Sequence, residues 1–222
     1  MPSIWTKGLL SFALLTCVTV APAGAALIDR GNGLIYDDDL NITWLEDANL
    51  AATNTFGVGG INTNGSMSWT TANSWIAGMN AATYKGFHNW RLPTTTQPDA
   101  TCGSQLSSAG LPDQGFGAGC TGSEMGHLSN VEGVTSAAPG VFDHVQTGPY
   151  WSGMEFALST NDAWDFSFNR GSQGNDSKGD PLFGWAVRSG DVSAPPVPEP
   201  STMLLLGSGL VGLIGWQRAR RG

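Results

Sequence analysis

The sequence predicts a single α+β domain whose first and last strands pair, with two helices and long loops between them. Strand-like alternation of apolar and polar residues is concentrated near the two ends of the domain, and two helix signals lie between them. The composition agrees, since the 222 residues include 31 Gly and 9 Trp and only 13% are charged. Such a chain is typical of a loop-rich domain outside the cytoplasm and not of a helical cytosolic enzyme.

The first 25 residues have the three zones of a secretory signal peptide. Lys7 and the amino terminus supply positive charge, residues 8–20 are apolar, and Ala23 and Ala25 form an A-x-A cleavage pattern. We therefore predict cleavage after Ala25 and export of the rest of the chain. An uncleaved anchor helix is the alternative.

Residues 26–193 are expected to form the folded domain. Its expected strands are residues 40–44, 150–156, 164–168 and 182–188, of which 164–168 alternates most clearly. Residues 169–180 are polar and rich in Gly, Asn and Ser, which predicts a long hairpin loop. The strand near residues 35–45 and the strand near 185–188 each need a sheet to bury one face, so we expect them to lie close together.

Two helices are expected between the terminal strands. Apolar residues recur at helical spacing after Ser68, a good N-cap residue, which predicts a helix from residue 69 to 79. A shorter helix is expected over residues 124–131, with Ser123 as its N-cap.

Cysteine usage agrees with export. Cys17 leaves with the signal peptide, so Cys102 and Cys120 remain as an even pair in an oxidising compartment, where a disulfide is the default. In the chain-entropy model a bridge across this loop is worth roughly 3 kcal/mol. Because the chain has no C-x-x-C motif, a structural bridge is favoured over a redox or zinc site.

The domain is more acidic than the whole chain. Residues 26–193 hold six basic and 17 acidic side chains, a balance of −11, against −8 for the full sequence. This charge keeps the domain soluble and disfavours direct adhesion to anionic lipid. Nucleic-acid binding is not expected, because it needs a basic surface.

The C-terminal segment, residues 194–222, reads as a tail separate from the domain. A Pro-rich linker is followed by an apolar run over residues 203–216 and by three arginines. The run has 14 residues, fewer than the roughly 20 that cross a bilayer, so length alone leaves a buried helix open. The prolines on one side and the arginines on the other favour a membrane helix with its basic end in the cytoplasm.

The string V-P-E-P-S-T at residues 197–202, the Leu- and Gly-rich run and the terminal arginines together resemble a PEP-CTERM sorting signal. The motif residues are Pro198, Glu199 and Pro200. The resemblance implies recognition by exosortase, a membrane enzyme that processes such tails near the motif. It also implies transient anchoring in the inner membrane, followed by delivery to the cell surface or the extracellular space.

The domain itself resembles the Lcl C-terminal domain family. The segments that carry the resemblance are L-I-D-R-G-N-G-L-I-Y-D-D-D-L-N-I-T-W-L (27–45), H-N-W-R-L-P-T (88–94), S-E-M-G-H-L (123–128), Y-W-S-G (150–153) and W-A-V-R (185–188). The resemblance implies a C-type lectin-like fold and supplies no chemistry. In W-R-L-P, Trp90 and Leu92 are expected to bury the turn, and Arg91 is expected to pair with an acid.

Several acidic groups could bind a metal ion. The D-x-D-x-N pattern that begins at Asp37 opens like a calcium loop, but Ile42 and Ala48 occupy the Gly and Glu positions, so an EF-hand is excluded. A looser calcium site at residues 37–39 or 46–47 stays open as an alternative. Neither a metal site nor a cofactor is predicted.

Two further patterns have a chemical and a structural interpretation. The triplet at residues 97–99 (Q-P-D) is shared with some galactose-binding lectins, but no W-N-D partner follows it, which indicates coincidence. Glu124 and His127 share a helical face and could act as acid and base. No nucleophile or H-E-x-x-H motif accompanies them, so a structural histidine is favoured and no catalytic residue is predicted.

These observations predict a non-catalytic surface or extracellular-matrix protein whose lectin-like domain binds glycan, exopolysaccharide or another surface protein. A ligand-free structural envelope protein is one alternative. The other is an enzyme acting on extracellular polysaccharide, which needs two carboxylates in one cleft. Glu155 with Asp162 or Asp165 are the candidates for that pair, although strand alternation places Asp165 on the solvent face.

We predict that Glu199→Ala leaves export intact and blocks processing of the tail, because the motif is read by a membrane enzyme and not by the export machinery. Immunoblotting of membrane and medium fractions should show the unprocessed chain retained in the membrane. A variant that is processed and released like the wild type would contradict the sorting interpretation.

Overall fold

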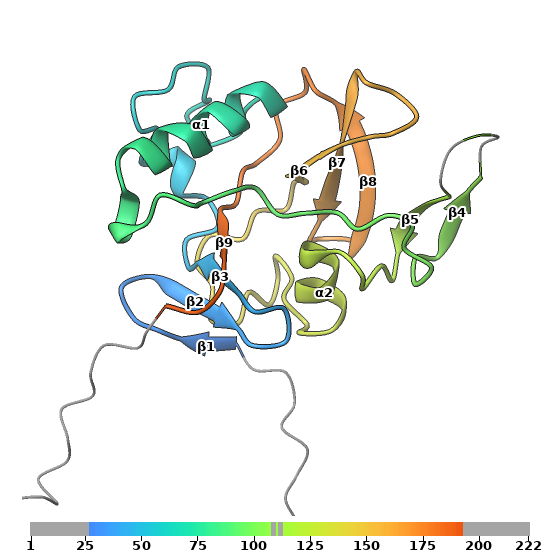
Figure 1. The fold of residues 1–222 in the computed structure, drawn as a ribbon, viewed down its shortest axis with the longest axis horizontal. Helices are drawn as coiled ribbons and strands as arrows, with labels where there is room; N and C mark the ends of the chain where they lie inside the picture. Colours follow the sequence, from blue (N-terminus) through green and yellow to red (C-terminus); the bar gives the residue numbers. More distant parts are fainter. Residues whose placement is uncertain (1–26, 108–109, 111–112, 193–222) are drawn as a thin grey trace, which may run out of the picture.

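The computed structural model describes residues 27–107, 110 and 113–192, and across them the strands form two antiparallel sheets (Figure 1). The predicted signal peptide, the sorting motif and the apolar run at 203–216 lie outside the described residues. Within the described ranges, every helix is too short or too polar to cross a membrane.

The first sheet joins the two ends of the domain in the order β1-β2-β3-β9. Its strands are β1 (Leu27–Asp29), β2 (Leu34–Asp37), β3 (Ile42–Leu45) and β9 (Val187–Ser189). Trp44 lies opposite Val187, and Thr43 lies opposite Arg188, in antiparallel register. The prediction that the terminal strands pair is therefore confirmed.

The second sheet has the order β4-β5-β8-β7-β6. Its strands are β4 (Ser104–Leu106), β5 (Gln114–Ala118), β6 (Tyr150–Glu155), β7 (Asp162–Ser167) and β8 (Ser172–Ser177). The prediction of a loop over residues 169–180 is wrong, because β8 pairs with β7 along its whole length. The polar sequence S-Q-G-N-D-S carries no apolar alternation that would reveal a strand. Backbone pairing with β7 and β5 holds it in place, and its buried side chain, Gln173, is polar.

The segment from residue 182 to 187 links the two sheets. We expected a continuous strand over residues 182–188, but only its end belongs to the regular strand β9. The rest exchanges partners every one or two residues, because it passes from one sheet to the other. Its isolated bridges are Met67–Leu182, Tyr150–Phe183 and Arg91–Val187.

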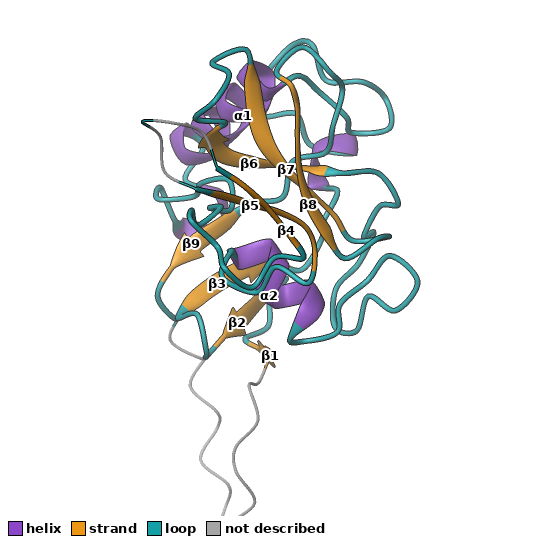
Figure 2. Cartoon of the chain, turned by 90° about the vertical axis from the view of Figure 1, so that its right-hand side faces the viewer, coloured by secondary structure: helices purple, strands orange, loops and turns teal. Residues whose placement is uncertain are grey.

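Both expected helices are present, as α1 (Trp69–Ala81) and α2 (Glu124–Asn130). Ser68 caps α1 as predicted, since its Oγ accepts a hydrogen bond from the Thr71 N–H at 3.2 Å. Ser123 is the N-cap residue of α2, as predicted, but its hydroxyl accepts from the Thr96 N–H and makes no capping hydrogen bond to the helix. Helix α1 packs beside β6, and α2 lies between the first sheet and β5 (Figure 2). Two short 3-10 turns are η1 (Leu50–Ala52) and η2 (Tyr84–Gly86).

Trp185 stands at the centre of the core. It is fully buried, and its indole N–H donates a 2.7 Å hydrogen bond to the Leu45 carbonyl. Four aromatic rings surround it at centroid distances of 5.0 to 5.7 Å: Trp44, Phe142, Tyr150 and Phe168. These rings come from both sheets and from the connecting loop, so one side chain holds all three parts together.

We predict that Trp185→Ala lowers the free energy of unfolding by about 3–5 kcal/mol, because it removes a large buried side chain and leaves the Leu45 carbonyl without its donor. Phe116→Ala is the matched control, since Phe116 is 37% exposed on β5 and its truncation leaves no enclosed cavity. Urea unfolding followed by fluorescence measures both. Equal losses for the two variants would contradict the central role of Trp185.

Candidate functional site

A polar groove of about 450 Å³ lies on the β7–β8 side of the second sheet. Carboxylates, hydroxyls, amides and one guanidinium line it, and no aromatic side chain does. The lining residues are Thr147, Gly148, Pro149, Asp165, Ser167, Asn169, Arg170, Ser172, Gly174, Asn175 and Asp176. They come from β7, β8, the turn between them and the segment that leads into β6.

Strand pairing explains why these side chains converge. Asp165 lies opposite Gly174 and Ser167 lies opposite Ser172, so both pairs face the same side of the sheet. Gly174 keeps the space beside the carboxylate open. A Cβ at this position would lie only 3.3 Å from Asp165 Oδ2 and would crowd it. The groove therefore exists because one strand supplies an acid where its neighbour supplies no side chain.

Asp165 is buried, contrary to the prediction that strand alternation sends it to solvent. Its exposed fraction is 6%, because β7 is covered on both faces and Trp151 lies opposite it on β6. Burial, with a smaller effect from the Asp176 charge, raises the pKa of Asp165 from 3.8 to about 7. Among the described residues, no hydrogen bond stabilises the charged form of this carboxyl and lowers its pKa.

Asp176 provides a second acid in the groove. It lies two residues beyond Gly174 on the same face of β8, which makes it the diagonal neighbour of Asp165, typically about 7–8 Å away across strands. Burial raises its pKa, and the charges of Asp180 and Asp162 add to the shift. No pattern in the sequence marks Asp176, because its strand carries no apolar alternation.

The other carboxylates proposed for an enzymatic pair lie outside the groove lining. Glu155 accepts a 2.6 Å ion pair from Lys178 Nζ, and its side chain is 54% exposed. Asp162 lies at the far end of β7, opposite Ser177. Of the three predicted candidates, the groove therefore contains Asp165 alone.

The W-R-L-P turn is structural, as predicted. Trp90 is buried, and the Arg91 guanidinium binds both carboxylate oxygens of Glu124 at 2.5 and 2.7 Å. Glu124 also accepts the Thr94 N–H at 2.7 Å, which fixes the turn to α2. The Glu124 carboxylate is thus engaged by Arg91 and Thr94, in keeping with the structural interpretation favoured over acid–base use with His127.

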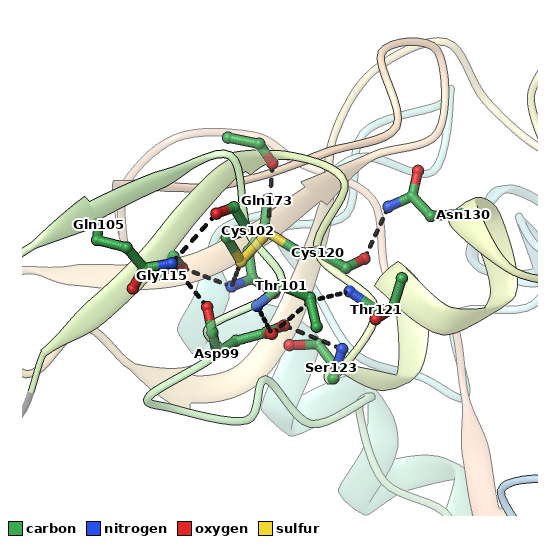
Figure 3. The surroundings of a disulfide bond; sticks show 12 residues. Asp99, Thr101, Cys102, Gln105, Gly115, Cys120, Thr121, Ser123, Asn130 and Gln173 are labelled. Carbon is green, nitrogen blue, oxygen red and sulfur yellow. Dashed lines mark hydrogen bonds between the residues drawn. A yellow bond between two sulfur atoms is a disulfide. The ribbon is translucent and has the colours of Figure 1, made fainter.

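Cys102 and Cys120, the pair expected from the sequence, form a disulfide with an S–S distance of 2.13 Å (Figure 3). Next to it, the Asp99 carboxylate accepts hydrogen bonds from Thr101 and from the Gly122 N–H. Gln97 exchanges two hydrogen bonds with the Gly115 backbone. The side chains of Gln97 and Asp99 thus hold the bridged loop in place. This structural role supports the interpretation that the likeness of the Q-P-D triplet to galactose-binding lectins is a coincidence.

The residues flagged for a looser calcium site fall into two places. Asp47 accepts from the Asn49 N–H at 2.9 Å and lies 3.0 Å from His144 Nδ1. Asp37 accepts the Leu40 N–H at 3.0 Å, and Asp39 lies near His127. The two alternatives therefore stay separate, each with its own histidine nearby.

Comparison with known proteins identifies two regions. The family model of the Lcl C-terminal domain matches residues 33–188, and the PEP-CTERM protein-sorting motif matches residues 196–221. No curated protein matches the chain, and no solved structure matches it. The motif supports an exported protein that is sorted by exosortase to the cell surface or the extracellular space. The C-type lectin-like fold stays a prediction.

We predict that Asp165→Asn makes stability less dependent on pH. The folded carboxyl keeps its proton up to about pH 7, whereas the unfolded one loses it near 3.8, so between these values the folded state binds more protons and wild-type stability falls as pH rises. Across this window the free energy of unfolding of the variant should rise relative to that of the wild type, by at most about 4 kcal/mol. Urea midpoints at several pH values measure the gain.

The exposed Asp113→Asn is the matched control and should keep the wild-type profile. An Asp165→Asn profile parallel to that of the wild type would show that the Asp165 carboxyl titrates alike in both states.

Proposed function

We propose that this chain, which belongs to the Lcl C-terminal domain family, is a non-catalytic surface or extracellular-matrix protein that binds polysaccharide in the groove beside Asp165. The sorting motif supports the location. In this proposal, residues 203–216 anchor the chain transiently in the inner membrane until exosortase processes the tail.

The observation that carries the proposal is the buried, uncommitted carboxyl of Asp165 at the groove. With a pKa of about 7, it is about half protonated at neutral pH and largely protonated in mildly acidic solution. A neutral carboxyl donates one hydrogen bond and accepts others, as a sugar hydroxyl does. A sugar hydroxyl bound in the groove would therefore exchange hydrogen bonds with this carboxyl in place of water.

The groove lining indicates the class of polysaccharide. Six of the seven Trp side chains in the described ranges are buried, and Trp69 is partly buried, so they build the core and form no stacking platform. Recognition would rely on hydrogen bonds from groups such as Ser167, Asn169 and Arg170. Because the domain has a charge balance of −11, we expect uncharged or amine-bearing chains to bind better than anionic ones.

The carboxylate pair in the same groove supports a second candidate, an enzyme that cleaves polysaccharide. Inverting glycosidases place an acid and a base about 6.5–9.5 Å apart, and the acid needs a raised pKa. Asp165 would be the acid and Asp176 the base. Binding alone needs only the hydrogen-bonding capacity of Asp165, whereas cleavage also needs its proton to leave.

This difference defines the test. The exported chain and its Asp165→Asn and Asp165→Ala variants would be measured against dextran, chitosan and alginate, with and without calcium. For the non-catalytic module, Ala should weaken binding by about tenfold or more, near 1.4 kcal/mol, because it removes the hydrogen-bonding group. Asn should retain binding, since its amide also donates and accepts.

Glu155→Gln is the matched control, because Glu155 lies outside the groove lining and should leave binding unchanged. Reducing-end release by the wild type that disappears in Asp165→Asn would replace the proposal with the enzymatic candidate. Absence of binding to all three polymers would favour a partner other than polysaccharide or a ligand-free envelope protein.

A further inference from the structure

His127 on α2 faces a cluster of carboxylates that comes from elsewhere in the chain. Its Nε2 lies 3.5 Å from Asp39 Oδ2, in the turn between β2 and β3, and 3.7 Å from Glu132 Oε1, just after α2. Asp37, the last residue of β2, completes the group. One potential ligand atom each from Asp37, His127 and Glu132 lies within 4.8 Å of the other two.

Two atoms of this cluster are buried without a hydrogen-bond partner. They are His127 Nε2 and Glu132 Oε1. The Glu132 side chain is only 9% exposed, and its distance of 3.7 Å from the imidazole is too long for a hydrogen bond. Burial of a carboxylate oxygen that has no hydrogen-bond partner costs free energy. A ligand bound next to Glu132 Oε1 would remove this cost.

The cluster also concentrates negative charge. Asp37 is 1% exposed, and burial raises its pKa, although the Leu40 N–H and the Trp44 indole favour its charged form. Burial and the charge of Asp37 raise the pKa of Glu132 in the same way. No lysine or arginine among the described residues forms an ion pair with Asp37, Asp39 or Glu132. A bound cation would supply the missing positive charge.

We propose that Asp37, His127 and Glu132 bind one divalent transition-metal ion of the Zn²⁺ type, with Asp39 as an additional carboxylate. One imidazole with carboxylates suits such ions, whereas Ca²⁺ prefers six to eight oxygen ligands. In tetrahedral coordination, bonds of about 2.0–2.2 Å place two ligand atoms of one ion roughly 3.3–3.6 Å apart. The three ligand atoms lie within 4.8 Å of one another, so binding of the ion requires the side chains to close by up to about 1.5 Å.

The ion would act as a structural link. It would join the end of β2 to α2 and to Glu132, two residues beyond the helix. The ion would thus connect Asp37 to Glu132, which are 95 residues apart in the chain. That separation explains why no local ligand spacing reveals the group. The site shares no residue with the Asp165 groove, so the two proposals stand or fall separately.

The test uses the exported full chain in detergent, freed of metal by chelation and titrated with Zn²⁺ alone. We expect one equivalent to bind by calorimetry and to raise the thermal midpoint. Glu132→Gln and His127→Gln should each weaken binding by more than about tenfold. His144→Gln is the matched control, because His144 also lies beside an aspartate but its side chain is 68% exposed and outside the cluster.

A second readout does not depend on variant folding. The chain has three histidines, so imidazole nitrogen resonances of the wild type can be followed individually during the titration. We expect the His127 Nε2 signal to shift with the first equivalent, ahead of His88 and His144. Binding that survives His127→Gln, a first shift at His144, equal binding of Ca²⁺, or no stoichiometric binding would each overturn the proposal.

Discussion

Burial of Trp185 in the segment that crosses between the sheets is the constraint on which the rest of the structure depends. The segment must satisfy its backbone groups while passing from the second sheet to the first, and it does so by bonding to a different neighbour at almost every residue. Trp185 fills the space between those neighbours. Pairing of the chain ends, the W-R-L-P turn and the packing of β6 all follow from this one path.

The use of tryptophan in the core determines what is left for recognition. Because most of the large aromatic rings are committed to packing, the groove on the second sheet is lined by hydroxyls, amides and carboxylates instead. Polar β8, held by backbone pairing to β7, supplies four of the eleven residues that line the groove. A groove of this kind is suited to ligands that exchange hydrogen bonds, and it is poorly suited to apolar ones.

The excess of acidic over basic side chains divides the carboxylates into two groups. Those paired with a cation hold the structure together, and buried ones without a cation can bind a ligand. With six basic side chains against 17 acidic ones, most carboxylates in the domain have no cationic partner. Glu124 is held by Arg91, Glu155 by Lys178 and Asp191 by Arg30, and these pairs fix turns and chain ends. Of the buried acids without a cationic partner, Asp99 is held by hydrogen bonds beside the disulfide, whereas Asp165 lies in the groove and Asp37 lies near His127. Their burial is costly unless a hydroxyl, a proton or a cation compensates it.

The sequence by itself determined the elements whose signals are local. Helix α1 with its Ser68 cap, the terminal strands and the cysteine pair each depend on residues close together in the chain or on composition. Tertiary structure alone decided β8, the burial of Asp165 and the surroundings of His127. A strand without apolar alternation forms only because its neighbour offers backbone partners, and an acid is buried only when distant segments cover it. Such effects arise from contacts between remote residues, which no pattern along the chain records.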